Sequence, residues 1–138
     1  LLGTDQGFLV FTAHSLRFYK TNGTETGSYT LPRGTISCGT VAGEDAVVLA
    51  DCGSTGTLYF ISSAGKLLGE TAISNQVRRL TAQADRVYVL DYQVLRVYDR
   101  QGGLQVTLVQ GARAANLSPN GSNLWLVGNG EVSRILIS

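Results

Sequence analysis

The sequence predicts an all-β fold in which four-stranded antiparallel sheets repeat along the chain as the blades of a β-propeller. The main observation is a short pattern: an apolar residue, a spacer, two large apolar residues, three more spacers and a glycine. It runs from Leu16 to Gly23, from Leu58 to Gly65 and from Leu95 to Gly102, and a looser copy begins at Val132. These starting points are 42, 37 and 37 residues apart. Repeats of about 40 residues that hold several short strands are typical of propellers.

Apolar runs mark four strands, a to d, in each complete repeat. The predicted strands of the second and third repeats are 35–41, 45–51, 57–63 and 66–73, then 77–83, 86–91, 94–100 and 104–110. The first repeat supplies strands b to d at 8–12, 15–20 and 27–31, with only Leu1–Leu2 for strand a. The fourth supplies strands a to c at 113–118, 123–128 and 131–138. The chain therefore divides into predicted blades at 1–31, 35–73, 77–110 and 113–138, about three and a half blades in all.

The spacing between strands b and c supports this register. It is eight residues in three of the repeats, at Phe8–Leu16, Val87–Leu95 and Leu124–Val132. In the second repeat it is twelve, from Ala46 to Leu58, because 52–56 supplies extra loop. One insertion therefore explains the single long repeat.

The b strands are near-continuous apolar runs, as expected for strands that are covered on both faces. We therefore expect near-complete burial between blades for the b and c residues that recur in register: Val48, Leu58, Phe60, Leu90, Leu95, Val97 and Leu126. Trp125 lies in the same run, and Trp125→Ala should lower the free energy of unfolding by ~3 kcal/mol or more.

Glycines and short polar stretches predict the turns. Gly23, Gly65 and Gly102 follow strand c at the position where a tight turn needs a positive φ. The stretch Ser118–Pro119–Asn120–Gly121 predicts a turn between strands a and b of the fourth repeat.

Two cysteines flank the predicted turn at 42–45. A hairpin centred there offsets Cys38 from Cys52 by about three residues, which is poor geometry for a disulfide. Two small, buried, unpaired residues are the favoured interpretation, since free cysteine is among the most buried residue types. The cysteines therefore do not indicate whether the protein occupies an oxidising or a reducing compartment.

Composition excludes several classes of protein. With 43% hydrophobic and 15% charged residues the chain is globular. The net charge is +1 and no basic cluster exceeds Arg78–Arg79, which argues against a nucleic-acid partner. The longest apolar runs are about five or six residues, against the ~20 that a membrane-spanning helix needs. A chain that lacks methionine and opens on Leu1 is expected to be a fragment or a processed product.

No motif predicts a catalytic residue, a metal site or a cofactor. His14 is the single histidine and falls in the b–c turn of the first repeat, where a solvated turn residue is favoured over a catalytic base. The two cysteines lack the spacing of a zinc site, and no nucleotide-binding or hydrolase motif is present.

Five residues are the candidates for contacts at the channel or the rim of the ring. Arg78, Arg79 and Arg113 are predicted on a strands near the channel, where they could meet an anion or pair with an aspartate. Asp51 and Asp91 end two b strands and could line one rim. The favoured alternative is that each aspartate caps its own turn by accepting backbone N–H bonds.

The turn after strand c resembles that of quinoprotein-like (PQQ-like) propeller repeats. In that family it reads roughly as an apolar residue, tyrosine, aspartate, two spacers, glycine and lysine, much as 97–102 reads Val-Tyr-Asp-Arg-Gln-Gly. Nearly the whole chain also resembles an uncharacterised bacterial family of membrane-anchored, extracytoplasmic propellers. The tryptophan that often docks between quinoprotein blades is missing, and so is the Trp-Asp dipeptide of WD-type repeats. The likeness implies an extracytoplasmic location, at the cell surface or in the periplasm.

These patterns favour a non-enzymatic scaffold or interaction module within a larger extracytoplasmic bacterial protein, with a protein or glycan partner. The alternative is an enzyme of the quinoprotein or lyase type with its site at the channel mouth. One histidine and scattered aspartates supply few of the acid–base groups that such an enzyme would need. A third interpretation is a purely structural repeat.

About three and a half blades do not close a ring, since closed propellers typically have four to eight. Apolar blade faces would then stay exposed at both ends of the chain. Further blades of a ~7–8-blade parent protein could complete the ring, which the missing start methionine favours, or a second copy of the chain could do so.

Overall fold

The computed structural model describes residues 2–4, 7–73, 77, 79–83, 85–91, 94–109, 114–120, 123–128 and 131–136, with side chains as far as residue 107. All of its regular structure is β-strand. The first sheet holds β1 (Leu2–Gly3), β2 (Gly7–Phe11), β3 (Ser15–Lys20) and β4 (Glu25–Thr30). The second holds β5 (Thr35–Ala42), β6 (Asp45–Asp51), β7 (Gly56–Ile61) and β8 (Leu67–Ile73).

The third and fourth sheets continue the same plan. The third holds β9 (Arg79–Gln83), β10 (Arg86–Leu90), β11 (Val94–Tyr98) and β12 (Leu104–Val109). The fourth holds β13 (Ala114–Asn120), β14 (Asn123–Gly128) and β15 (Glu131–Leu136). Within each sheet the strands pair antiparallel in chain order. Among the described residues no helix is long and apolar enough to cross a membrane.

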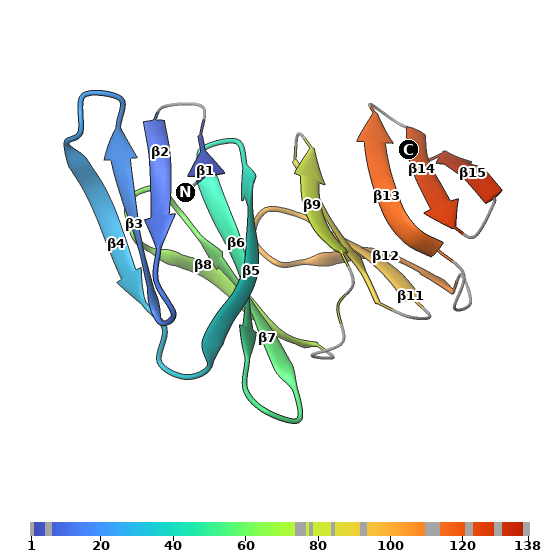
Figure 1. Cartoon of the computed structure of the whole chain (residues 1–138), viewed down its shortest axis with the longest axis horizontal. Helices are drawn as coiled ribbons and strands as arrows, with labels where there is room; N and C mark the ends of the chain where they lie inside the picture. The colour runs from blue at the N-terminus through green and yellow to red at the C-terminus, as the bar shows by residue number, and fades with distance from the viewer. Residues whose placement is uncertain are drawn as a thin grey trace.

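The four sheets follow one another in an arc, with the first and fourth at its two ends (Figure 1). Their first strands lie together along the inside of the arc, because β5 contacts both β1 and β9, and β9 contacts β13. Sheets of four antiparallel strands arranged in this way are propeller blades. The chain is therefore a partial β-propeller, as the repeat pattern predicts.

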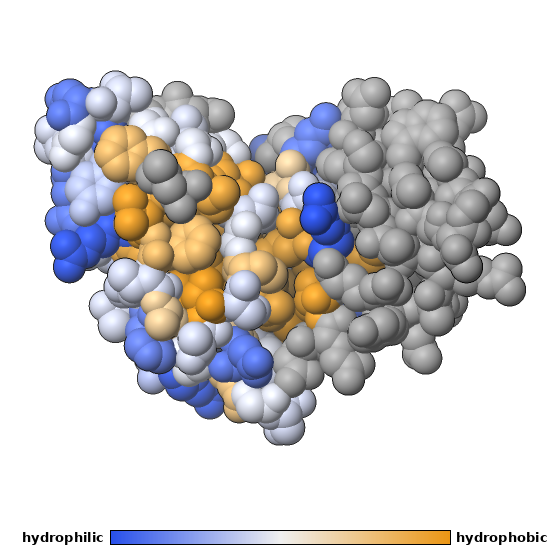
Figure 2. Space-filling view, in the orientation of Figure 1, coloured by the Kyte–Doolittle hydropathy of each residue, from blue (hydrophilic) through white to orange (hydrophobic). Residues whose placement is uncertain are grey.

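The core lies in two seams between neighbouring sheets. The first seam packs Leu9, Leu16 and Phe18 of the first sheet against Ala46, Val48, Tyr59 and Ile61 of the second. The second seam packs Val47, Leu49, Leu58 and Phe60 of the second sheet against Val87, Val89 and Tyr98 of the third. The second sheet is therefore buried on both faces. Figure 2 shows apolar residues around the first three sheets and hydrophilic ones along the outer edge near β4.

The predicted core is confirmed where the structure describes it. Six residues have at most 1% of their surface exposed: Val48, Leu58, Phe60, Leu90, Leu95 and Val97. The expectations for Trp125 and Leu126 concern side chains outside the described set, so they stay predictions.

The predicted turn glycines are also confirmed, since Gly23, Gly65 and Gly102 have φ of 89°, 83° and 90°. The loop insertion is the segment 52–55, between β6 and β7. The hairpin predicted between strands a and b of the fourth repeat is confirmed, but 118–121 places its turn too early, because β13 continues through Pro119 and Asn120, which pair with Leu124 and Asn123. Proline is tolerated there because β13 is an edge strand, where a missing N–H need not break the ladder.

Two strand glycines mark where one sheet meets the next. Gly27 lies opposite Phe18 in the first sheet, and Gly69 lies opposite Phe60 in the second. A Cβ atom on Gly27 would stand 2.4 Å from the backbone of Ala64, and one on Gly69 would stand 2.0 Å from the Gln101 carbonyl oxygen. The c–d turn of each following sheet therefore packs directly on these glycines.

Candidate functional site

The two ends of the sheets form two rims. Antiparallel strands in chain order place every b–c loop at the same end as the connections between sheets. We call this end the bc rim; among the described residues it includes the b–c loops 12–14 and 52–55 and the connection 31–34. The a–b and c–d turns form the opposite rim.

A groove of about 700 Å³ opens at the bc rim, between the second and third sheets. Its polar side chains are those of Arg33, Cys52, Thr55, Thr57 and Arg96. No carboxylate is among the described residues that line it. The groove therefore offers two guanidinium groups and two hydroxyls, and it suits a ligand that brings hydrogen-bond acceptors.

Arg33 lies in the connection between β4 and β5, directly after Pro32, and its side chain is exposed. Within the described part of the chain its guanidinium makes no hydrogen bond or ion pair. Each guanidinium carries five N–H donors in a planar fork that matches a carboxylate. Arg33 is thus available to a ligand that enters the groove.

Arg96 is held in place from one side. Its Nη1 lies 3.2 Å from Oδ2 of Asp91, and the two side chains are 30% and 13% exposed. Asp91 Oδ1 accepts a 2.7 Å hydrogen bond from the backbone N–H of Val94. The carboxylate therefore fixes the direction of the Arg96 fork, and the Arg96 side chain also lines the groove.

The acidic candidates serve their own turns, as the favoured interpretation predicts. Asp51 is exposed, and its Oδ1 accepts a 2.9 Å hydrogen bond from the backbone N–H of Gly53. Asp91 accepts from Val94 in the next b–c loop. Asp91 also accepts a hydrogen bond from an arginine, Arg96. This arginine lies on strand c and not, as the sequence suggested, on strand a.

The arginine candidates are not brought together by the described structure. Arg79 is exposed at the start of β9, where it pairs with Leu90, and it does not line the groove. Arg78 and Arg113 lie outside the described residues. Contacts of these three arginines and of the two aspartates with a ligand at the channel or rim stay a prediction.

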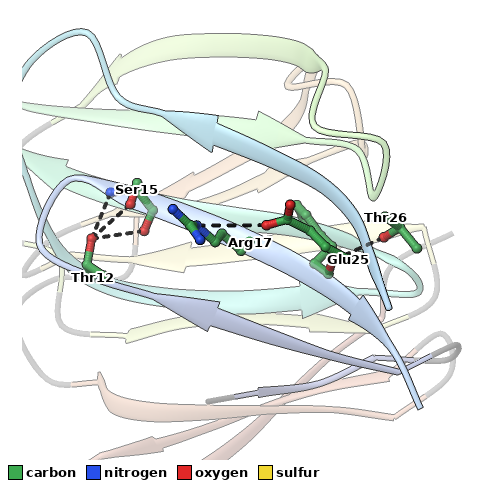
Figure 3. Close-up of polar contacts among 6 residues, drawn as sticks. Thr12, Ser15, Arg17, Glu25 and Thr26 are labelled. Carbon is green, nitrogen blue, oxygen red and sulfur yellow. Dashed lines mark hydrogen bonds and ion pairs between the residues drawn. The ribbon is translucent and has the colours of Figure 1, made fainter. Parts of the chain in front are cut away.

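His14 is an exposed residue of its b–c turn, as expected. Its Nδ1 lies 3.1 Å from the carbonyl oxygen of Gly34, so the ring links the first b–c loop to the neighbouring connection. Thr12 and Ser15 brace the same loop, with their hydroxyl oxygens 2.9 Å apart (Figure 3). The histidine thus supports the shape of the bc rim.

The opposite rim holds a small pocket and an ion-pair clamp. The pocket, about 140 Å³, lies between the first two sheets beside Lys20, Thr26 and Glu44. In the clamp, Arg100 Nη2 of the third sheet lies 2.7 Å from Asp45 Oδ2 of the second, and its Nη1 lies 3.7 Å from Asp85 Oδ1. This clamp joins the second and third sheets.

The cysteines are unpaired, and both are half-buried rather than fully buried. Cys38 lies opposite Leu49 in the second sheet, three residues from Cys52, so the predicted offset is confirmed. Burial raises the pKa of the Cys38 thiol, and a hydrogen bond with Ser37 partly lowers it. In the described part of the chain no three His, Cys, Asp or Glu residues gather as metal ligands.

Sequence reasoning missed the groove. Arg33 and Arg96 come from different repeats and occupy unrelated positions within them, so no repeat pattern pairs them. The only available signal was the loop insertion at 52–56, whose residues form one wall of the groove. An insertion in an otherwise regular repeat often marks the binding face.

Solved structures share this fold. BamB from Moraxella catarrhalis matches with a TM-score of 0.59 and 13% identity, over 93% of this chain and 41% of that one. A protein of unknown function from Bacteroides caccae matches with a TM-score of 0.52 and 14% identity, over 98% of this chain and 58% of that one. The chain thus spans less than two thirds of either protein, and at such identities the likeness shows the fold alone.

No protein-family model matches the sequence, and no curated protein matches it.

Proposed function

We propose that the chain is a non-enzymatic propeller scaffold that binds an extended, acidic segment of a partner protein in the groove at the bc rim. The observation that carries this proposal is the donor-rich lining between the second and third sheets, with Arg33 free and Arg96 oriented by Asp91. A carboxylate side chain of the partner would accept from the Arg33 fork, and partner backbone carbonyls would accept from Arg96 and Thr55.

The shape of the groove supports a peptide better than a small substrate. It is open at the surface, and its polar groups come from three separate segments of the chain, namely Arg33, the stretch 52–57 and Arg96. Small-molecule sites are usually enclosed and largely apolar, with a few convergent polar groups. An open groove with separated hydrogen-bond donors is closer to the surfaces that recognise extended segments.

The alternative is an enzyme of the quinoprotein or lyase type at the channel mouth. It requires acid–base groups that converge on one point. Asp51 and Asp91, the two acidic residues at this rim that the sequence singles out, bind their own turns instead. This arrangement favours binding over catalysis.

The proposed setting is extracytoplasmic, as part of a larger bacterial protein. The resemblance to quinoprotein-like repeats and to membrane-anchored bacterial propellers supports this location. The two structural neighbours come from bacteria, which agrees with a bacterial origin. A glycan partner remains the second candidate, because hydroxyl and guanidinium groups also bind sugar hydroxyls.

Binding of a fluorescein-labelled, glutamate-rich peptide tests the proposal, measured by fluorescence anisotropy at low salt. We expect Arg33→Glu to weaken binding about tenfold, which corresponds to about 1.4 kcal/mol. The matched control is Lys66→Glu, which makes the same charge change at an exposed residue of the opposite rim and should alter the affinity less than about twofold. Equal binding by wild type and Arg33→Glu would contradict the proposed groove. A neutral oligosaccharide that binds in place of the peptide would point to a glycan partner.

A further inference from the structure

The pocket of about 140 Å³ at the rim opposite the groove lies between the first and second sheets, and we call it the rim pocket. It reaches inward to Phe18, which is 2% exposed, so it enters the seam between the two sheets. The charged residues that line it are Lys20, at the end of β3, and the half-buried Glu44, in the turn between β5 and β6.

Both charges are available to a ligand. In the part of the chain that the structure describes, neither side chain makes an ion pair or a hydrogen bond. Lys20 follows Leu16 and Phe18 at two-residue intervals along β3, and residues at this interval share one face of a strand. Because Leu16 and Phe18 pack against the second sheet, Lys20 lies on the face that is turned toward Glu44 and its sheet.

The second seam carries a bridging cation at the corresponding place. Arg100 reaches across that seam, with its Nη2 atom 2.7 Å from Asp45 Oδ2. Its Nη1 atom lies 3.7 Å from Oδ1 of Asp85, which belongs to the same sheet as the arginine. A guanidinium group with two carboxylates therefore occupies this place between the second and third sheets.

The first seam lacks this bridge. The turn glycines after strand c and the pairing of the strands identify the counterparts of the three residues. They are Ser63 for Arg100, Gly7 for Asp45 and Glu44 for Asp85. Serine is too short to cross the seam and glycine has no side chain, so no side chain takes the place of the arginine. The rim pocket lies at this place, and Glu44 is the carboxylate that has no arginine beside it.

Lys20 brings a positive charge to the other side of the rim pocket. The pairing register gives it Ser62 as its counterpart in the second sheet, so the second seam has no lysine at that position. Lys20 does not replace the missing arginine, because it makes no ion pair with Glu44. The rim pocket therefore presents one unpaired ammonium group and one unpaired carboxylate, which match a molecule that carries both charges.

We propose that the rim pocket binds a small amino acid in its zwitterionic form. The ammonium group of the ligand pairs with Glu44, in the place that Arg100 fills in the second seam, and its carboxylate pairs with Lys20. A cavity of about 150 Å³ accommodates benzene, so an amino acid of about five to seven non-hydrogen atoms suits this pocket. The site lies at the rim opposite the groove, and the proposal therefore goes beyond the proposed function and does not depend on it.

Titration of the ¹⁵N-labelled chain with glycine, β-alanine and γ-aminobutyrate tests the proposal by nuclear magnetic resonance. These ligands differ in the distance between their two charges. We expect at least one of them to shift the amide signals of Lys20, Ser63 and Ala64 in a saturable way and to leave that of Thr55 in the groove unchanged. Acetate and methylammonium each carry one of the two charges and should bind at least about tenfold more weakly.

Two charge-removing variants identify the groups that bind. Lys20→Gln and Glu44→Gln should each weaken binding about tenfold, because each removes one charge and keeps a side chain of similar length. The matched controls are Lys66→Gln and Glu70→Gln, at exposed residues that do not line the rim pocket, and they should alter the affinity less than about twofold.

Ser63→Arg restores the arginine of the second seam and should abolish binding, because the new side chain fills the rim pocket and pairs with Glu44. Its circular dichroism spectrum should match that of the wild type. The absence of a saturable shift with all three amino acids overturns the proposal, and so does an affinity that neither Lys20→Gln nor Glu44→Gln changes. Acetate or methylammonium that binds as tightly as the best amino acid overturns it as well and assigns the pocket to a simple ion.

Discussion

At the scale of single residues, the closest contacts between sheets are backbone contacts at glycine. Gly27 and Gly69 have ordinary strand partners, and nothing in their own sheets requires glycine. The requirement comes from the following sheet, whose c–d turn reaches within 2.4 Å and 2.0 Å of the positions where a Cβ atom would lie. Val106 takes the equivalent place in the third sheet, opposite Val97.

Gly69→Ala should lower the free energy of unfolding by about 1–3 kcal/mol, the usual cost of overpacking. The added methyl group would collide with the Gln101 carbonyl oxygen, and backbone cannot give way as a flexible side chain can. Gly3→Ala is the control, since a Cβ atom there meets nothing within 4 Å. Urea denaturation compares the two variants. Equal stabilities would show that the turn does not rest on Gly69.

Tyr59 buries a hydroxyl that has no hydrogen-bond partner in the described structure, although the whole residue is 0% exposed. An unpaired buried hydroxyl costs about 1–3 kcal/mol of desolvation, and its removal recovers much of that cost. Tyr59→Phe should therefore stabilise the protein by about 1 kcal/mol in urea denaturation. A clear loss of stability would mean that the hydroxyl is satisfied.

The raised pKa of the Cys38 thiol makes a pH-dependent prediction. The folded state favours the neutral thiol, so this contribution to stability is fully present below the pKa of the unfolded chain and is lost as pH rises through the folded pKa. In a Cys52→Ser variant, iodoacetamide should reach half its maximal rate at a higher pH in folded than in urea-unfolded protein, because the thiolate is the nucleophile. Identical pH–rate profiles for the folded and unfolded protein would show that burial does not raise the pKa of Cys38.

At the scale of elements, the repeats could be predicted closely, because each b–c hairpin repeats its spacing and each c–d turn repeats its glycine. The error at 118–121 has a physical reason. Ser, Pro, Asn and Gly each favour turns locally, but the edge position of β13 lets the strand continue through Pro119. Local propensity was overridden by the position of the strand in its sheet, which sequence does not reveal.

The clamp at Arg100 provides a comparison between two aspartates that share one partner. Asp45 is 12% exposed and Asp85 is 89% exposed. Asp45→Asn should lower the free energy of unfolding by about 1.5–3 kcal/mol, since it weakens a charge-assisted bond in partly buried surroundings. Asp85→Asn should cost less than ~0.5 kcal/mol, because water and salt screen an exposed pair. Thermal melts of both variants measure this, and equal losses would contradict the dependence on burial.

At the scale of the whole molecule, the second sheet is the most buried of the sheets whose side chains the structure describes. Every residue of β7 is buried, and only Asp51 of β6 is exposed, whereas four of the six residues of β4 are exposed. We expect backbone amides of β6 and β7 to exchange with deuterium most slowly and those of β4 to exchange early. Nuclear magnetic resonance measures these rates residue by residue. Amides of β4 as protected as those of β7 would contradict a core centred on the second sheet.

The groove was beyond sequence reasoning for a different reason. It depends on which faces of neighbouring sheets meet. Arg33 and Arg96 are 63 positions apart and come together only because two sheets and a connection converge.

The strict chain order of the strands has a consequence for how the protein folds. Every strand pairs only with its neighbours in sequence, so each hairpin closes a short loop and loses little chain entropy in doing so. All-β proteins usually fold slowly because their contacts join distant segments, and pairing within hairpins shortens the loops that each sheet must close. Each sheet can nucleate on its own and then recruit the next one. The order in which the sheets form is therefore open to tuning by substitutions that strengthen a single hairpin.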